Sequence, residues 1–197
     1  IAAFESLQDV PGKVRERVEA ALRGEGEPAG DTLWAEAIAG RLPEDPAVLA
    51  DALKTRAAAA PLTSLQKLVD ALRTAEPQVR PAVKRGEWRA LRGAVHQALA
   101  SRGSRIALYD LRETIAEADE PLPVSYLAAL HVLGDESCLE SIAAAYSRAR
   151  STDAWWQRQL AAAFQAIVKR ERITKRHTAL KRIQHRWPAA FAALAAQ

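Results

Sequence analysis

The feature that most constrains this chain is an echo of apolar residues at a spacing of 34 between Trp88 and Ile173. Three sets of apolar residues coincide under this shift: Trp88, Leu122 and Trp156; Val95, Ala129 and Ala163; Leu99, Leu133 and Ile167. A further set follows with one residue of slip: Ile106, Leu139 and Ile173. Such a period is typical of helical hairpin repeats, each of which buries its apolar face only against its neighbours.

The composition favours an all-α fold. Of 197 residues, 49% are hydrophobic, which is enough for a sizeable core in one domain. Most of this content is Ala and Leu, both strong helix formers. The chain has no convincing run of alternating apolar and polar residues, so we predict no strands.

We expect a single domain, 1–197, built from antiparallel helix pairs that stack into a short right-handed α-solenoid. Its expected parts are an N-terminal hairpin over 1–23, a flexible glycine-rich loop over 24–30, helical repeats over 31–187 and a C-terminal capping helix over 188–197. Three hairpins are predicted within the echo: 87–101 with 105–118, 123–133 with 136–149, and 153–170 with 173–186.

Local signals predict several helix ends. Asp31 or Thr32 is expected to cap the helix that follows, and Pro46 suits a first helical position. Thr63 with Gln66 fits a capping box. The helix after Pro46 is expected to turn Val48 and its apolar neighbours inward. The predicted core comprises Leu49, Leu53, Leu65, Leu68, Leu91, Leu99, Leu108, Leu111, Leu130, Leu133, Ile142, Leu160, Ile167, Leu180 and Ile183.

The middle unit carries a family resemblance. YLAALHVLGDESCLESIAAAY, from Tyr126 to Tyr146, has an Ala/Leu-rich helix, a Leu-Gly-Asp turn and a second helix. In this pattern the glycine ends the first helix and the aspartate caps the second. The segment resembles a HEAT repeat, and looser copies run over 89–111 and 159–180 within about 46–187. The tetratricopeptide repeat has a similar period but other signature positions.

The resemblance implies a curved scaffold that binds other proteins. A minority of HEAT-like proteins bind nucleic acid, and one family of alkylpurine DNA glycosylases is built this way. For such a glycosylase, Asp153, Trp155 and Trp187 would supply the carboxylate and aromatics around an extruded base. Asp153 is more simply explained as a helix cap.

Positive charge is concentrated near the C-terminus. The span 169–186 holds eight Lys or Arg against one acid, a net +7, so the remaining residues carry −3 of the chain's total of +4. On a helix from Ile173, apolar residues fall on one face and cations largely on the other. The candidate binding residues are Lys169, Arg170, Arg172, Lys175, Arg176, Lys181, Arg182 and Arg186.

This basic segment has four interpretations. It can be a solvated helix face, since Lys and Arg are ordinary solubilising residues. It can dock an acidic protein surface. It can neutralise the phosphates of DNA or RNA. A membrane surface is the least favoured interpretation.

Trp155 is a separate candidate for binding. The echo places Trp156 in the core, and Trp155 lies about 100° away on the same helix. It is therefore either a partly exposed interface anchor or, more simply, packing against the next repeat.

The sequence contains no recognisable catalytic constellation. The single cysteine, Cys138, excludes a disulfide within the chain and is interpreted as a small buried residue. His96, His131, His177 and His185 form no metal-binding pattern, and Walker A, G-x-G-x-x-G and G-x-S-x-G motifs are absent. Asp110, Glu113 and Glu117 share one helix face and are interpreted as a solvated acidic stripe.

We therefore expect a non-enzymatic scaffold with no cofactor or metal, and with another protein as its partner. The alternative is a nucleic-acid-binding domain that uses 169–186, and a repair-type glycosylase is less favoured. Because no apolar run approaches bilayer length and the start is unlike a signal peptide, a cytoplasmic location without membrane contact is expected.

Overall fold

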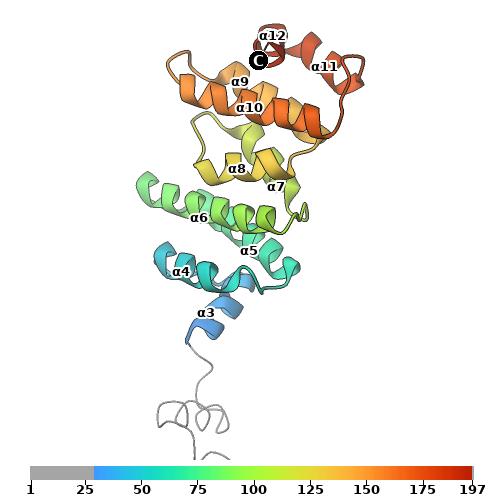
Figure 1. The fold of residues 1–197 in the computed structure, drawn as a ribbon. Coiled ribbons are helices and arrows are strands. Elements are labelled where there is room, and N and C mark those ends of the chain that lie inside the picture. Colours follow the sequence, from blue (N-terminus) through green and yellow to red (C-terminus); the bar gives the residue numbers. More distant parts are fainter. Residues whose placement is uncertain (1–28, 197) are drawn as a thin grey trace, which may run out of the picture.

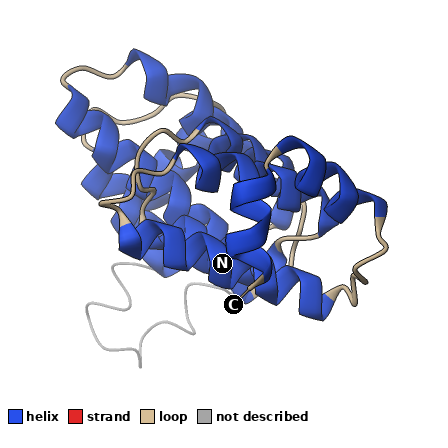
Figure 2. Cartoon of the chain, turned by 90° about the horizontal axis from the view of Figure 1, so that it is seen from above, coloured by secondary structure: helices blue, strands red, loops and turns tan. Residues whose placement is uncertain are grey.

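The computed structural model describes residues 29–196. In this range the chain is helical, and no strand occurs among the described residues (Figure 2). The helices, in chain order, are α3 Ala29–Ile38, α4 Pro46–Arg56, α5 Leu62–Ala75, α6 Ala82–Ser101, α7 Leu108–Glu117, α8 Val124–Leu133, α9 Leu139–Arg148, α10 Ala154–Arg170, α11 Thr178–Arg186 and α12 Pro188–Ala195. Two 3₁₀ turns, η1 Glu76–Gln78 and η2 Glu136–Cys138, interrupt the connections. The all-α prediction is confirmed, whereas the predicted hairpin over 1–23 and most of the loop over 24–30 lie outside the described residues.

The helices follow one another along a single axis from α3 to α12 (Figure 1). In one layer α4 packs on α6, α6 on α8 and α8 on α10. In the other, α3 packs on α5, and α7 on α9, which also contacts α11 and α12. The layers meet through the pairs α5–α6, α7–α8 and α9–α10. Each helix thus hides its apolar stripe between the opposite layer and its neighbours in its own layer.

Burial follows the 34-residue echo. The equivalent residues Trp88, Leu122 and Trp156 are 4%, 4% and 2% exposed. Every residue of the predicted core is buried. The prediction for Val48 is wrong, because its side chain is 49% exposed while its neighbour Leu49 is fully buried. The helix α4 offers only a narrow stripe to the core.

Several predicted helix ends need correction. The helix α3 begins at Ala29, so Asp31 lies inside its first turn and pairs with Arg56 instead of capping. The capping box is wrong as well, since α5 begins at Leu62 directly after Pro61. Pro46 does open α4, and Asp45 Oδ1 accepts from the Ala47 N–H at 2.9 Å.

The second helix of the third hairpin begins at Thr178 and not at 173, because 171–177 form a turn. Asp153 directly precedes α10, but its side chain makes no capping hydrogen bond. Asp135 caps the 3₁₀ turn η2 and not α9 itself: its carboxylate accepts from the Ser137 N–H at 2.9 Å, and α9 follows directly after η2 with Cys138 at its N-cap.

Arginines close the ends of helices in neighbouring units. Arg102, at the end of α6, donates to the Ala57 and Ala60 carbonyls beyond α4. Arg170, 68 residues later at the end of α10, donates to the His131 and Gly134 carbonyls at the end of α8. These carbonyls lack intrahelical partners, and a cation there also complements the negative end of the helix dipole. We call these two residues the arginine clamps.

Close packing of α6 on α8 depends on Gly93. A Cβ at this position would lie 2.2 Å from Ser125 Oγ and 2.8 Å from the Tyr126 ring. Gly86, on the same helix, would meet nothing within 4 Å. Substitutions at the two glycines therefore distinguish a packing role from the ordinary conformational cost of glycine in a helix.

We expect Gly93→Ala to lower the free energy of unfolding by about 1–3 kcal/mol, because the added methyl overpacks the α6–α8 contact. Gly86→Ala should raise it by about 0.5–1 kcal/mol, because alanine favours the helix and nothing obstructs it. Urea denaturation of both variants checks this. Stabilisation by both substitutions would contradict the packing role of Gly93.

Candidate binding surfaces and a buried polar cluster

Six of the predicted cations form an exposed surface at the C-terminal end of the stack. None has a carboxylate partner within the described part of the chain, and all are exposed. We call this surface the cationic edge: Lys169, Arg172, Lys175, Arg176, Lys181 and Arg186. It runs from the end of α10 through the turn into α11, which Figure 1 shows at the top of the stack.

The structure separates the other candidates from this surface. Arg170 is one of the arginine clamps, and its guanidinium is occupied by backbone carbonyls. Arg182 Nε lies 2.6 Å from Glu140 Oε1. Trp155 is 42% exposed but stands at the other end of α10, about 20 Å along the helix from Lys169.

Acids around the cationic edge already have partners outside it. Glu171 lies 2.6 Å from Arg105, and Glu136 lies 3.2 Å from His177. The Arg186 guanidinium stacks on the Trp187 ring, 4.6 Å from its centroid. Ile173 and Ile183 are buried and fix the segment to the body. The exposed cations therefore stand on a fixed support with little opposing charge.

Arg172 adopts a backbone conformation that normally favours glycine. Its φ is +53°, whereas the same position after α3 and after α6 is held by Gly40 and Gly103, with φ of +88° and +63°. In all three cases the next N–H bonds a carbonyl five residues back, as for Ile173 with Val168 at 2.9 Å. A non-glycine residue in this region is strained, so a side chain is kept there at a cost.

We expect Arg172→Gly to raise the free energy of unfolding by about 1 kcal/mol, because glycine removes the left-handed strain. Lys175→Gly, in the same turn but without a positive φ, should leave stability unchanged or lower it. Thermal melts of both variants measure the difference. Equal effects of the two substitutions would argue against strain at Arg172.

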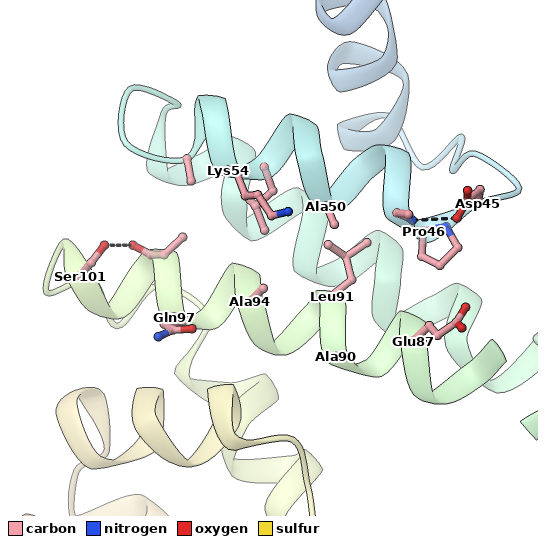
Figure 3. Close-up of a pocket in the computed structure, with 14 residues that line it drawn as sticks. Asp45, Pro46, Ala50, Lys54, Glu87, Ala90, Leu91, Ala94, Gln97 and Ser101 are labelled. Carbon is pink, nitrogen blue, oxygen red and sulfur yellow. Dashed lines mark hydrogen bonds between the residues drawn. The ribbon is translucent and has the colours of Figure 1, made fainter. Parts of the chain in front are cut away.

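A second surface is an apolar groove between α4 and α6. Its volume is about 690 Å³, and alanine is the commonest residue in its walls: Ala47, Ala50, Ala57, Ala90, Ala94 and Ala98. Asp45 and Glu87 stand at one mouth, and Lys54 and Ser101 at the other (Figure 3). Alanine side chains are too short to fill the space between these helices, whereas Gly93 and Tyr126 close the equivalent space between α6 and α8.

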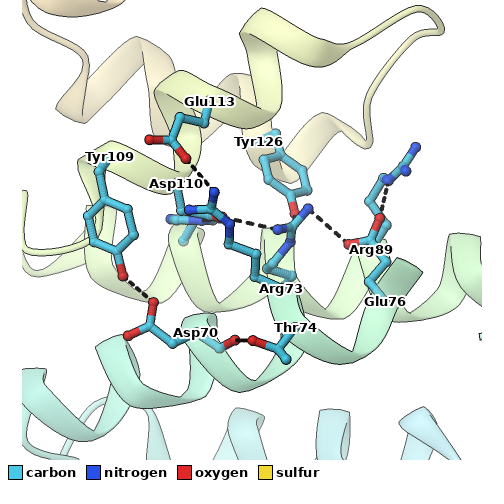
Figure 4. Close-up of polar contacts among 11 residues, drawn as sticks. Asp70, Arg73, Thr74, Glu76, Arg89, Tyr109, Asp110, Glu113 and Tyr126 are labelled. Atoms are coloured by element: carbon cyan, nitrogen blue, oxygen red, sulfur yellow. Dashed lines mark hydrogen bonds and ion pairs between the residues drawn. The ribbon is translucent and has the colours of Figure 1, made fainter. Parts of the chain in front are cut away.

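The structure also holds a buried polar cluster centred on Arg92, whose partners Glu76, Asp110 and Tyr126 are labelled in Figure 4. Its guanidinium lies 3.0 Å from Asp110 Oδ1 and 2.9 Å from Glu76 Oε2, and its Nε donates to the Tyr126 hydroxyl at 2.7 Å. The Asp110 carboxylate also accepts from His96 Nε2 at 2.7 Å. The cluster joins η1, α6, α7 and α8 in the middle of the stack.

The prediction of a solvated acidic stripe is wrong for Asp110, which is fully buried. Glu113, on the same face, is half-buried and pairs with Arg73 of α5. The 34-residue echo does contain a sequence signal for this cluster. Arg92 falls at the position of Tyr126 one period later and of Leu160 two periods later, so a charged residue occupies a core position.

Burial shifts several pKa values in and beside the cluster. Desolvation lowers the pKa of His96 below 6.5, and the bond to Asp110 opposes this only in part. Desolvation also raises the pKa of Tyr126. It raises the pKa of Tyr109, which hydrogen-bonds to Asp70, to about 12. His96 is therefore neutral, with its proton on Nε2 facing Asp110.

We expect His96 to make stability fall in mild acid. The unfolded chain takes up its proton near pH 6.5 and the folded chain only at lower pH, so the stability supplied by neutral His96 is complete above 6.5. Below 6.5 it declines by at most about 1.4 kcal/mol per pH unit. His96→Gln, which keeps a donor for Asp110, should flatten this part of the curve in denaturation from pH 7.5 to 5. An unchanged slope would contradict the assignment.

The remaining candidates behave as isolated residues. Cys138 is buried, and burial raises the pKa of its thiol, so its interpretation as a small core residue is confirmed. His131 is exposed. Among residues 29–196 no three His, Cys, Asp or Glu side chains are grouped so as to hold a metal ion. No helix in the same range combines the length and apolarity needed to cross a bilayer.

Comparison with protein-family models, with curated proteins and with solved structures finds no match to this chain.

Proposed function

We propose that this chain is a non-enzymatic scaffold of HEAT-like repeats, forming a short right-handed α-solenoid, which binds another protein. The proposal is supported by the two-layer stacking of helices and by a 34-residue echo whose positions are all buried except Ile106, which is half-buried. A stack of this kind offers a rigid surface assembled from several units, which suits the recognition of an extended partner.

The α4–α6 groove is the observation that carries the proposal. Its alanine walls allow the backbone of another helix to approach closely. Beyond the Glu87 mouth of the groove, Val83 lies one turn earlier on the same face of α6 and is 78% exposed. Exposed apolar side chains close to an apolar groove are characteristic of an interaction site.

The occupant is a single amphipathic helix of the partner, with an apolar face and a positively charged end. Asp45 and Glu87 at one mouth complement either basic side chains or the positive N-terminal end of that helix. A small-molecule substrate fits less well, because the lining offers few polar groups to orient it. Recognition of this type reads apolar anchors at helical spacing.

A displayed library of amphipathic helical peptides tests the groove. Peptides selected on the wild-type chain should bind Ala94→Arg at least tenfold more weakly, because an arginine side chain would fill the groove and oppose a basic helix end. The matched control is Ala162→Arg, an exposed alanine two periods further along the chain, in α10. It should leave binding within about twofold.

Equal weakening by the two substitutions would overturn the groove as the site. Failure to enrich any helical peptide would also overturn it. Circular dichroism of both variants establishes that they remain folded.

A further inference from the structure

Unlike a typical protein interface, the cationic edge has no large exposed hydrophobic side chain. The described residues with large exposed hydrophobic side chains are Val48, Val83, Val124, Val132 and Trp155, and none of them lies in 169–186. Specific protein interfaces bury aromatic or aliphatic anchors at their centre. A surface of cations without such anchors is better matched to a partner that is itself a continuous line of charge.

Polar groups between the cations supply the other half of such a match. Thr174, Thr178 and Gln184 are exposed within the same segment. Hydroxyl and amide side chains beside Lys and Arg are the usual donors to phosphate oxygens, and these contacts fix position without reading sequence. The edge therefore has both the charge and the donors that a phosphodiester backbone requires.

The aromatic side chains argue for a duplex over a single strand. Single-strand binders stack bases on exposed aromatic rings. Trp187, next to the edge, is only half-exposed and carries the Arg186 guanidinium on its ring. Trp155 is exposed but lies at the opposite end of α10. The edge thus offers no ring for base stacking among its own residues.

The backbone conformation of Arg172 also indicates that its positive charge is functional. Arg172 keeps a left-handed conformation where glycine serves after α3 and α6. Residues held in strained conformations are retained where the surrounding structure or a function requires their side chain. The Arg172 side chain has no carboxylate partner within the described residues, so no ion pair among them accounts for it.

We propose that the cationic edge binds the phosphodiester backbone of a nucleic acid duplex, without base-specific contacts. The interaction neutralises phosphates with Lys175, Arg176, Lys181 and their neighbours, and releases condensed counterions. It does not depend on the proposed protein-binding groove, which lies on α4 and α6. With both surfaces in use, the chain would link a partner protein to a duplex.

The test measures affinity by fluorescence anisotropy for a 20-bp DNA duplex, an RNA duplex of the same length, single-stranded DNA and polyglutamate. Salt is varied from 20 to 200 mM. We expect binding of a duplex, tighter than of single strands or polyglutamate, with log affinity falling linearly with log salt. The DNA and RNA arms identify which duplex is preferred.

The variant Lys175→Gln/Arg176→Gln/Lys181→Gln should reduce the magnitude of the salt slope by about 2.7, since each B-DNA phosphate that a cation neutralises contributes about 0.9. The matched control, Lys67→Gln/Arg150→Gln/Arg158→Gln, removes the same charge from exposed positions outside the edge. It should change the slope by less than about 0.9. Arg170 and Arg182 are left intact, because both are engaged within the chain.

Three results would overturn the proposal. Absence of duplex binding by the wild type at 20 mM salt would exclude the site. An equal loss of duplex affinity in the two triple variants would show that only the net charge of the chain matters. Tighter binding of polyglutamate than of either duplex would assign the edge to an acidic protein.

Discussion

The Arg92 guanidinium is the contact on which the middle of this structure depends. It bridges carboxylates from η1 and α7 and a hydroxyl from α8, and all four groups are buried. A buried charge is tolerated only when it is paired and hydrogen-bonded, so removing one partner would leave the others uncompensated. Apolar helices could slide past one another with modest loss, but this cluster is satisfied only in one register. We interpret the cluster as the set of contacts that fixes how η1, α6, α7 and α8 pack against one another.

The repeating part of the fold could be predicted because burial itself is periodic. Trp88, Leu122 and Trp156 reach the core by the same geometry, and a shift of 34 finds them without knowledge of the partners. The cluster could not be found this way. Asp110 on its own helix resembles a solvated acid, and its partners Arg92 and His96 come from another helix. The prediction for Val48 fails for a related reason, since the width of a buried stripe depends on the neighbouring helices.

For the candidate surfaces too, one part could be predicted from the sequence and another depends on neighbouring helices. Composition alone locates the cations between 169 and 186, but Arg170 and Arg172 have opposite roles two residues apart, one capping α8 and one facing outward. Only the position of the α8 carbonyls decides this. The groove could not be predicted because alanine favours close helix packing, whereas between α4 and α6 the alanines leave an open space. Whether small residues close a contact or leave a gap depends on the separation of the two backbones, which the sequence does not encode locally.

The arginine clamps also affect the order in which the chain can fold during synthesis. Arg102 lies 45 residues after the Ala57 carbonyl that it satisfies, and Arg170 lies 39 residues after the His131 carbonyl. A ribosome delivers the chain from its N-terminus at a limited rate. Until the arginine has been synthesised, the carbonyls at the end of each clamped helix can bind only water or other proteins. The ends of α4 and α8 are therefore completed by residues from later in the chain, after the helices themselves have been synthesised.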